Sequence, residues 1–477
     1  MKNLMFLLLI FPVLLCHSCK SNTGKMIWNI NDQEYLETQG FNVLVFHNYY
    51  PEGDQGGIEF IHHDNRTASN GYINADLPGG QRFPRPVKAD RIVDSVKGEI
   101  RATVKVPEFN FNYDVRVWPE NNTIHLVVDL EKPVPAEWKG KLTFDLQLFP
   151  VTYAGKTFHL VNQSGVIPVE GLGPMVSSSD GTAKPLPLAT GPKLIIAPED
   201  PMIKLQIEQL KGDISLIDGR NSSLSGWILV SSEIPEGVDK GALEWIITPS
   251  LVPGWLHRPV ISISQVGYHP DQAKRAVIEL DARSSEIEKA VLKNIGNDGK
   301  ISEIKSGTPE VWGNFLRYKY AVFDFSSIND PGIYTVSYGD ITSEPFSIGK
   351  DVYQKNVWQP TLEIYFPVQM CHMRIRDRSR VWHGACHLDD ALQAPVSTIH
   401  VDGYKTYETT ETSYKPFITV PGLNRGGWHD AGDNDLAAGS QAQTTLFLAL
   451  AGEAFGIDVD QTTIKQDALY VELRKPD

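Results

Sequence analysis

Apolar and polar side chains alternate along most of the first half of the chain. In residues 113–117, tyrosine and valine alternate with aspartate and arginine. Two further runs have the same period of two, with apolar side chains at Ile124, Leu126, Val128 and Leu130 and at Leu142, Phe144, Leu146 and Leu148. A period of two is typical of half-buried antiparallel strands. We therefore predict an all-β sandwich region over residues 25–258, although its length also leaves room for two separate parts.

Residues 259–349 have the pattern of a second, smaller β unit. Pro253-Gly254 and Arg258-Pro259 mark a boundary before it, and Asn297-Asp298-Gly299 is a hairpin-type turn within it. The expected strands cover residues 276–280, 316–325 and 333–338. Short strands with regular turns in a segment of this length predict an immunoglobulin-like β-sandwich.

After residue 350 the pattern becomes helical. Residues 352–373 are predicted to form a helix that two prolines interrupt. A polar and aromatic loop follows over residues 376–427, and a second helix is expected over residues 436–455, where Gly456 ends it.

The second helix has a nearly continuous apolar run over residues 446–451, which predicts burial on several sides, as in an inner helix of a helical barrel. Asp433 or Asn434 is placed to cap it. Two helices and a long loop cannot close a hydrophobic core of their own. We therefore expect residues 350–477 to be the incomplete N-terminal part of an all-α domain, with packing of this segment against the β units as the alternative.

The first residues have the features of an export signal. A short basic start precedes residues 4–15, which are almost wholly apolar. This run is too short to cross a bilayer but suits the centre of a signal peptide. A small residue before Cys19 is typical of bacterial lipoproteins, so we predict a signal peptide over residues 1–18 and acylation of Cys19. Acylation at Cys16 and an ordinary cleaved signal peptide are the alternatives. The expected location is the outer membrane, the periplasm or the cell surface, with membrane contact only through the lipid.

Charge and cysteine content narrow the possible partners. The 477 residues include 44 basic and 58 acidic side chains, which gives a formal net charge of -14. A nucleic-acid partner needs a basic face, so a neutral or weakly charged substrate fits better. Two of the four cysteines lie in the signal region. The remaining pair, Cys371 and Cys386, is too small a set for a disulfide framework.

Two carboxylates lie three residues apart in Asp430-Ala-Gly-Asp433. Hydrolysis of a glycosidic bond needs a pair of carboxyl groups, and in an inverting enzyme the acid stands about 6.5–9.5 Å from the base to leave room for water. Two neighbouring aspartates can hold one water molecule, but they cannot also flank the glycosidic oxygen. They therefore suit the water-activating half of an inverting site. A helix cap and a surface charge are the alternative roles.

A second group of candidate functional residues comprises Cys371, Cys386, His387 and His429. Thiolate and imidazole groups are good zinc ligands, and four of them make a closed tetrahedral structural site. Because His429 is next to Asp430, bound zinc would fix the loop that carries the two carboxylates. A disulfide between the two cysteines is the alternative, and His372 or His383 could replace one of the ligands.

The run Gly426-Gly-Trp-His-Asp-Ala-Gly-Asp433 resembles the signature of glycoside hydrolase family 9, in the branch with an N-terminal immunoglobulin-like module. Gln265-Val-Gly-Tyr268 and Asp330-Pro-Gly-Ile-Tyr334 resemble parts of that module. The resemblance implies an (α/α)6 barrel that cleaves β-1,4-linked glucans with inversion, as cellulases do. It also implies that Asp433 is the general base, that Asp430 helps to orient the water, and that the four cysteine and histidine positions hold a structural zinc ion.

The sequence departs from the family in two respects. The family's general acid is a late glutamate without a counterpart here, so we expect a truncated catalytic domain and an inactive chain. The residues after Asp433 also differ, which leaves xyloglucan, mixed-linkage glucan and other plant polysaccharides open as substrates. The alternative from another class is a surface lipoprotein that binds β-glycans without catalysis. Candidate sugar-stacking side chains are Trp118, Trp138 and Trp255.

Overall fold

The chain divides into two compact units, and each is described by itself. The first unit comprises Met1–Arg258, Leu280–Ser284 and Asn314–Tyr318, and the second comprises the remaining residues. The computed structural model describes residues 26–46, 57–75, 87–107, 110–134, 136–177, 183–221, 226–353, 357, 375–378, 381–383, 387, 391–393, 413–423, 429 and 436–455.

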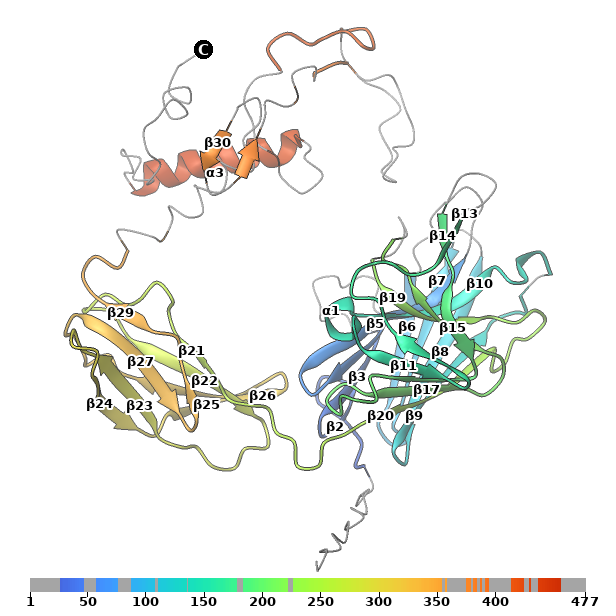
Figure 1. Ribbon diagram of the computed structural model, residues 1–477, viewed down its shortest axis with the longest axis horizontal. Coiled ribbons are helices and arrows are strands. Elements are labelled where there is room, and N and C mark those ends of the chain that lie inside the picture. Colours follow the sequence, from blue (N-terminus) through green and yellow to red (C-terminus); the bar gives the residue numbers. More distant parts are fainter. Residues whose placement is uncertain are drawn as a thin grey trace, which may run out of the picture. The chain divides into compact units, whose positions relative to one another are not determined.

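The first unit is built from two nine-stranded sheets, coloured blue to green in Figure 1. One sheet has the order β1 (Asn29–Ile30), β2 (Leu36–Thr38), β3 (Phe41–Val45), β4 (Ile58–His62), β5 (Asn65–Ala75), β10 (Leu142–Leu148), β19 (Ile228–Glu233), β18 (Ile214–Asp218) and β15 (Pro187–Gly191). The other has the order β12 (Gln163–Val166), β11 (Thr157–Leu160), β16 (Lys193–Ile196), β17 (Leu205–Gln209), β20 (Leu243–Pro249), β9 (Thr123–Leu130), β8 (Phe111–Glu120), β7 (Glu99–Val106) and β6 (Val87–Asp94). Shorter elements are η3 (Ala136–Trp138), α1 (Pro150–Tyr153), β13 (Met175–Ser177) and β14 (Ala183–Pro185).

One hydrophobic core fills the space between these two sheets. The apolar positions of the three runs that the sequence singled out are all buried, which confirms the predicted strand pattern. Trp245 packs edge-on against Phe144 of the other sheet, with ring centroids 5.3 Å apart. Its indole Nε1 also donates to the Ser232 hydroxyl, at 3.2 Å. A single pair of sheets, rather than two separate parts, therefore accounts for the length of this region.

The second unit contains most of a smaller sandwich of two sheets (Figure 1), and two short segments at the ends of its strands, Leu280–Ser284 and Asn314–Tyr318, belong to the first unit. Its four-stranded sheet has the order β21 (Val260–Ser262), β22 (Arg275–Asp281), β26 (Tyr318–Asp324) and β25 (Glu310–Phe315). The five-stranded sheet consists of β24 (Ile301–Gly307), β23 (Ala290–Ile295), β27 (Gly332–Tyr338), β28 (Ile341–Thr342) and β29 (Phe346–Ile348). The immunoglobulin-like sandwich predicted here has short strands as expected, and the predicted strands at 276–280 and 333–338 correspond to β22 and β27.

The two motifs that suggested this module have clear structural roles. Gly267 has a φ of +103°, and a Cβ at this position would lie 2.5 Å from the Ser347 carbonyl oxygen. Glycine is therefore required where the chain passes β29. The next residue, Tyr268, packs between Phe325 and Phe346, at centroid distances of 5.4 and 5.3 Å. In the second motif, the Tyr334 hydroxyl donates to the Asp330 carbonyl oxygen at 2.9 Å, as in the tyrosine corner of immunoglobulin-like sandwiches.

Less of the C-terminal part is described. A helix, α3 (Ala438–Phe455), forms where the sequence predicts one. The predicted loop over residues 376–427 contains instead a short hairpin of β30 (Ile375–Arg378) and β31 (Val381–His383). The predicted helix over residues 352–373 lies almost wholly outside the described residues, and the start of a helical barrel stays a prediction. None of the described helices is long and apolar enough to cross a membrane.

The predicted burial of α3 on several sides is wrong for the described structure. Four apolar side chains of the run at 446–451 are about half exposed, with exposed fractions of 56% for Leu446, 58% for Phe447, 50% for Leu448 and 49% for Leu450. The helix itself is explained by its many Ala, Leu and Gln residues, which have high helix propensity. Apolar composition alone predicted burial, but burial also needs a partner that packs against the helix.

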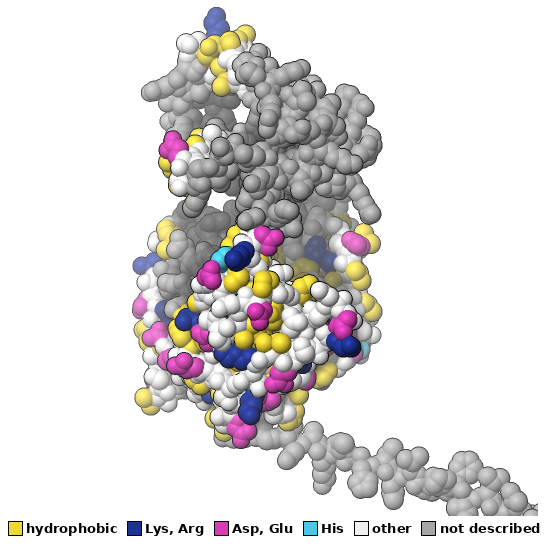
Figure 2. Space-filling view, turned by 90° about the vertical axis from the view of Figure 1, so that its left-hand side faces the viewer, with side chains coloured by type: hydrophobic (Ala, Val, Ile, Leu, Met, Phe, Trp, Pro, Cys, Tyr) yellow, Lys and Arg dark blue, Asp and Glu magenta, His cyan; other side chains and the backbone are white. Residues whose placement is uncertain are grey.

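Acidic and basic side chains are interspersed on the described surface. On the face drawn in Figure 2, hydrophobic side chains lie singly or in small groups among charges of both signs. Neither sign forms a large continuous patch there, although the chain as a whole carries a net charge of -14.

Candidate functional site

The predicted catalytic and metal-binding residues are only partly described. Asp430 and Asp433, Cys371 and Cys386, and the predicted lipidation site Cys19 lie outside the described residues. His387 and His429 are described. The proposed geometry of the two carboxylates and the two thiolates therefore stays a prediction.

His387 and His429 lie side by side although they are far apart in the sequence. Their ring centroids are 5.2 Å apart, with an angle of 49° between the planes. His429 is buried, with 5% of its surface exposed. The backbone of His387 has a φ of +55°, which is uncommon for a residue other than glycine. Residues in such conformations cluster at functional sites.

The separation of these two rings fits a shared metal ion. A zinc ion about 2.0–2.1 Å from one nitrogen of each ring, with a tetrahedral angle between the two bonds, places the ring centroids about 5 Å apart. Within the described part of the chain, no group of three or more His, Cys, Asp or Glu side chains is placed to hold a metal. The two histidines are thus the described half of the predicted ligand set.

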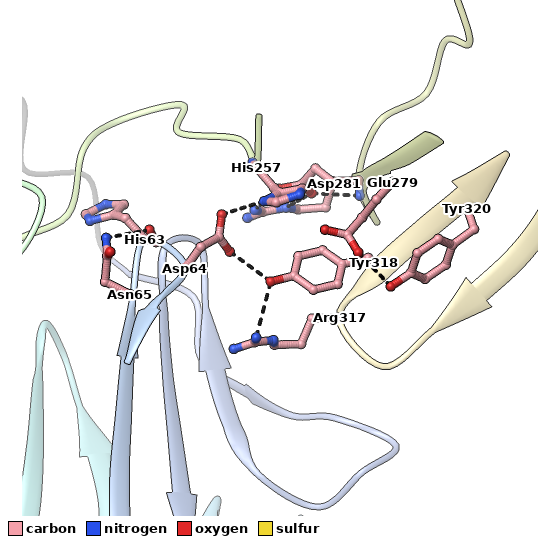
Figure 3. Close-up of polar contacts among 10 residues, drawn as sticks. His63, Asp64, Asn65, His257, Glu279, Asp281, Arg317, Tyr318 and Tyr320 are labelled. Carbon is pink, nitrogen blue, oxygen red and sulfur yellow. Dashed lines mark hydrogen bonds and ion pairs between the residues drawn. The ribbon is translucent and has the colours of Figure 1, made fainter. Parts of the chain in front are cut away.

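A polar network in the first unit centres on the turn between β4 and β5 (Figure 3). His63 and Asp64 occupy this two-residue turn with φ values of +45° and +67°. A turn of this kind usually contains Asn and Gly, because both positions need a positive φ. The side chains of His63 and Asp64 form hydrogen bonds with residues that are distant in the sequence.

Asp64 accepts hydrogen bonds on both carboxylate oxygens. His257 Nδ1 lies 2.5 Å from Oδ2, and the Tyr318 hydroxyl donates to Oδ1 at 3.3 Å. The rings of His257 and Tyr318 also touch, with centroids 4.5 Å apart. Arg317 donates to the Tyr318 hydroxyl at 3.2 Å, so the tyrosine is held from two sides (Figure 3).

Asp281 is the second carboxylate of the network and is almost fully buried. It accepts from the His257 amide at 2.9 Å and from Nε and Nη2 of Arg283 at 2.8 and 2.7 Å. Burial by itself would raise the pKa of Asp281, but the hydrogen bonds from Arg283 and from the His257 and Arg283 amides outweigh it and lower the pKa. The ion pair with Asp281 in turn raises the pKa of Arg283.

These groups border a hollow of about 300 Å³. It is also lined by side chains that can hydrogen-bond a neutral ligand and by one indole ring, namely Glu37, Gln39, Asn42 and Trp255. Asp281 is held by the Arg283 guanidinium and by two backbone amides, and its lowered pKa keeps it ionised. A general acid needs a raised pKa instead. The site therefore suits binding or structural support better than proton transfer.

His62 and His63 connect the same turn to the segment that follows β20. His63 Nδ1 lies 2.8 Å from the Met202 carbonyl oxygen, and its Nε2 accepts from the Val252 amide at 3.2 Å. These partners fix a neutral ring with the proton on Nδ1. His62 Nε2 contacts the Ser250 carbonyl oxygen, and burial lowers the pKa of His62 to about 4.

Sequence reasoning identified only one residue of this hollow. Trp255 was a candidate sugar-stacking residue and does line it, although its ring packs edge-on against His63 at 5.1 Å. Trp118 stacks on His125 at 5.2 Å, and Trp138 packs partly buried against the core. None of the charged or tyrosine residues of the network was predicted from the sequence. The nearest sequence feature, Arg258-Pro259, predicted a boundary between domains and not a binding site.

Residues 257–343 match the family model of the cellulase N-terminal Ig-like domain. This match confirms the resemblance to the immunoglobulin-like module for this segment. A search of curated proteins gave no match.

Three solved structures also show limited similarity to the chain. A metagenome-derived glycoside hydrolase family 9 endoglucanase is 26% identical over 36% of this chain and 30% of that chain, with a TM-score of 0.28. A family 9 protein of Bacteroides ovatus is 21% identical over 36% of this chain and 28% of that chain, with a TM-score of 0.25. Endoglucanase J30 is 22% identical over 34% of this chain and 27% of that chain, with a TM-score of 0.26. TM-scores this low do not establish a common fold, and the matched parts span less than a third of each of these proteins.

Proposed function

Because the chain carries a cellulase N-terminal immunoglobulin-like domain over residues 257–343, we propose that it acts in the hydrolysis of β-1,4-linked glucan by inversion. The match of this domain is the observation that carries the proposal. It is supported by the run Gly426–Asp433, which follows the domain along the chain and resembles the signature of glycoside hydrolase family 9.

Asp433 is proposed as the general base and Asp430 as the residue that helps to hold the attacking water. In an inverting reaction the base removes a proton from water as the oxygen attacks the anomeric carbon, while a separate carboxylic acid protonates the leaving oxygen. The proposal assigns only the first of these two roles. The substrate is a neutral β-glucan or a related plant polysaccharide.

The proposed structural zinc site consists of Cys371, Cys386, His387 and His429. The 5.2 Å separation of the two imidazole rings supports it. Zinc at this position would add a fixed cross-link and no chemistry of its own, because four protein ligands leave no position for substrate. The chain's own contribution is to place His429 directly before Asp430, so that the ligand and the proposed catalytic residue share one backbone segment.

The proposed location is outside the cytoplasm, with Cys19 as the lipid attachment site. The apolar run at residues 4–15 and the small residue before Cys19 support this. Labelling with radioactive palmitate should be lost in Cys19→Ala and kept in Cys16→Ala. Labelling that persists in Cys19→Ala contradicts the assignment.

Hydrolysis is tested with the full-length protein that contains these residues. Reducing ends are measured on soluble mixed-linkage β-glucan and hydroxyethyl cellulose, and NMR identifies the anomer that forms first. We expect the α-anomer. Asp433→Asn should lower kcat by about 10²–10⁴-fold, the usual contribution of a general base. Asp435→Asn is the matched control and should keep its activity. First formation of the β-anomer, or full activity of Asp433→Asn, contradicts the proposal.

Glycan binding without catalysis is the alternative function, and the same preparation distinguishes it. Affinity electrophoresis in gels that contain a soluble glucan measures retention independently of turnover. Retention with no hydrolysis of any glucan in the panel favours the binding protein. Hydrolysis that depends on Asp433 favours the enzyme.

A further inference from the structure

The outer face of the four-stranded sheet in the second unit carries an unusual set of side chains. Alternate residues of β22 and β26, such as Ile278 and Phe323, are buried in the sandwich. Their neighbours therefore face away from the core, because successive side chains of a strand point to opposite sides. Among these outward residues are Arg275, Tyr320 and Val322.

Trp312 of β25 lies on this outer face, because its ring meets that of Tyr320 edge-on at a centroid distance of 6.2 Å. Trp312 is 67% exposed. Tyr320 is held in place because its hydroxyl donates to Glu279 Oε2 at 2.8 Å (Figure 3). A large ring that is supported from one side and open to solvent is typical of a binding surface.

A hollow of about 530 Å³ lies beside this tryptophan. Its volume is within the range of small-ligand sites, about 300–1,000 Å³. The residues that matter for the chemistry of its lining are Trp312, Val322, Arg275, Lys305, Glu310 and Asp324.

The lining charges balance, with two cations and two carboxylates. Arg275 Nε lies 3.3 Å from Asp324 Oδ2. Hydrogen bonds from the amide and side chain of Ser326 lower the pKa of Asp324, so this carboxylate is ionised at neutral pH. A strongly charged ligand would meet charges of its own sign here. A neutral ligand with many hydroxyl groups can use both signs as hydrogen-bonding partners and place its apolar C–H groups against the indole.

We propose that this surface, defined by Trp312 and the hollow beside it, binds a neutral β-linked glycan chain without cleaving it. The choice of β-linked glucan rests on the proposed function, whereas the neutral, hydroxyl-rich class of ligand rests on the lining itself. This site would bind a polysaccharide to the immunoglobulin-like domain. Its residues are different from those proposed to take part in the reaction.

Affinity electrophoresis tests the proposal with mixed-linkage β-glucan, xyloglucan and hydroxyethyl cellulose as probes. The background is Asp433→Asn, so that hydrolysis does not alter the probe. Trp312→Ala should weaken retention about tenfold, as expected for the loss of one aromatic contact. Trp312→Phe should restore part of it. Phe315→Ala is the matched control, because Phe315 is on the same strand, is 52% exposed and does not line the hollow.

Three outcomes overturn the proposal. One is unchanged retention of Trp312→Ala, and another is equal loss in Phe315→Ala, which points to damage to the strand. The third is absence of retention for the parent on every probe. If retention depends on Trp312 but the protein with Asp433 intact hydrolyses no glucan, the binding site is supported and the proposed hydrolytic function is contradicted.

Discussion

His62 and His63 are neighbours in the sequence and have separate partners in the fold. Their rings stack at a centroid distance of 4.7 Å, and each contacts a different part of the chain before the boundary at Arg258. Two stacked cations would repel each other, and burial removes the water that would solvate them. Both effects favour neutral rings, in agreement with the lowered pKa values of both histidines.

The stability of the first unit should therefore depend on pH through His62. The folded state binds this proton with a pKa of about 4, whereas the unfolded chain has the ordinary value of 6.5. Above pH 6.5 neither state is protonated, so His62 contributes no pH dependence there. As the pH falls from 6.5 towards 4, the unfolded chain binds the proton first, and the free energy of unfolding should fall by about 1.4 kcal/mol per pH unit.

Urea unfolding at several pH values checks this slope. His62→Gln should flatten it, since glutamine can donate to Ser250 but does not titrate. His159→Gln at an exposed position is the control and should keep the parent's slope. Equal slopes in the parent and in His62→Gln would contradict the assignment.

The network around Asp64 shows what sequence could not predict at this scale. Asp64 is 193 residues from His257 and 254 residues from Tyr318. No spacing rule relates residues this far apart. By contrast, His387 and His429 were grouped as candidate zinc ligands from their residue type and from the family resemblance, and their ring centroids lie 5.2 Å apart.

At the scale of elements, Gly267 has a positive φ and also lies close to the backbone of Ser347 in β29. Gly267→Ala would need both a strained backbone and a shift of Ser347. We expect the free energy of unfolding of the immunoglobulin-like sandwich to fall by about 2–3 kcal/mol. Hydrogen exchange measured by mass spectrometry on peptides from residues 260–349 would detect this as faster opening.

Gly299→Ala separates the two causes. Gly299 has a φ of +75°, and a Cβ there would meet nothing within 4 Å. Only the backbone strain of about 1–2 kcal/mol is expected. If both variants open at the same rate, close packing against Ser347 contributes nothing.

Strands and helices were predictable to the extent that their side chains follow a local period. The alternation at residues 113–117 and the runs that follow placed the buried faces of β8, β9 and β10. Period alone does not say which strands pair, and β10 pairs with β5 and β19, not with β9. The hairpin of β30 and β31 was missed because its polar composition, with charged residues such as Arg376 and Asp377, has no alternating apolar face.

At the scale of the whole molecule, the proposed zinc site would tie together residues from 371 to 429. Elemental analysis of the full chain should find about one zinc ion per chain. His429→Ala should lose it, whereas His383→Ala should keep it if the four proposed ligands are correct. Chelation should also lower the midpoint of thermal unfolding. Absence of zinc together with absence of free thiols would indicate the disulfide instead.

The order of strands in the first unit has a consequence for how the protein is made. β19 and β20 come last in its sequence, yet they lie inside their sheets, with β19 between β10 and β18 and β20 between β17 and β9. Until residues 228–249 are available, each sheet consists of two pieces with bare inner edges, which can pair with other chains. Such non-local pairing is slow. If the protein is exported as its first residues suggest, translocation of about 250 residues must finish before this sandwich can close, so a chaperone that shields strand edges would raise its yield most at this stage.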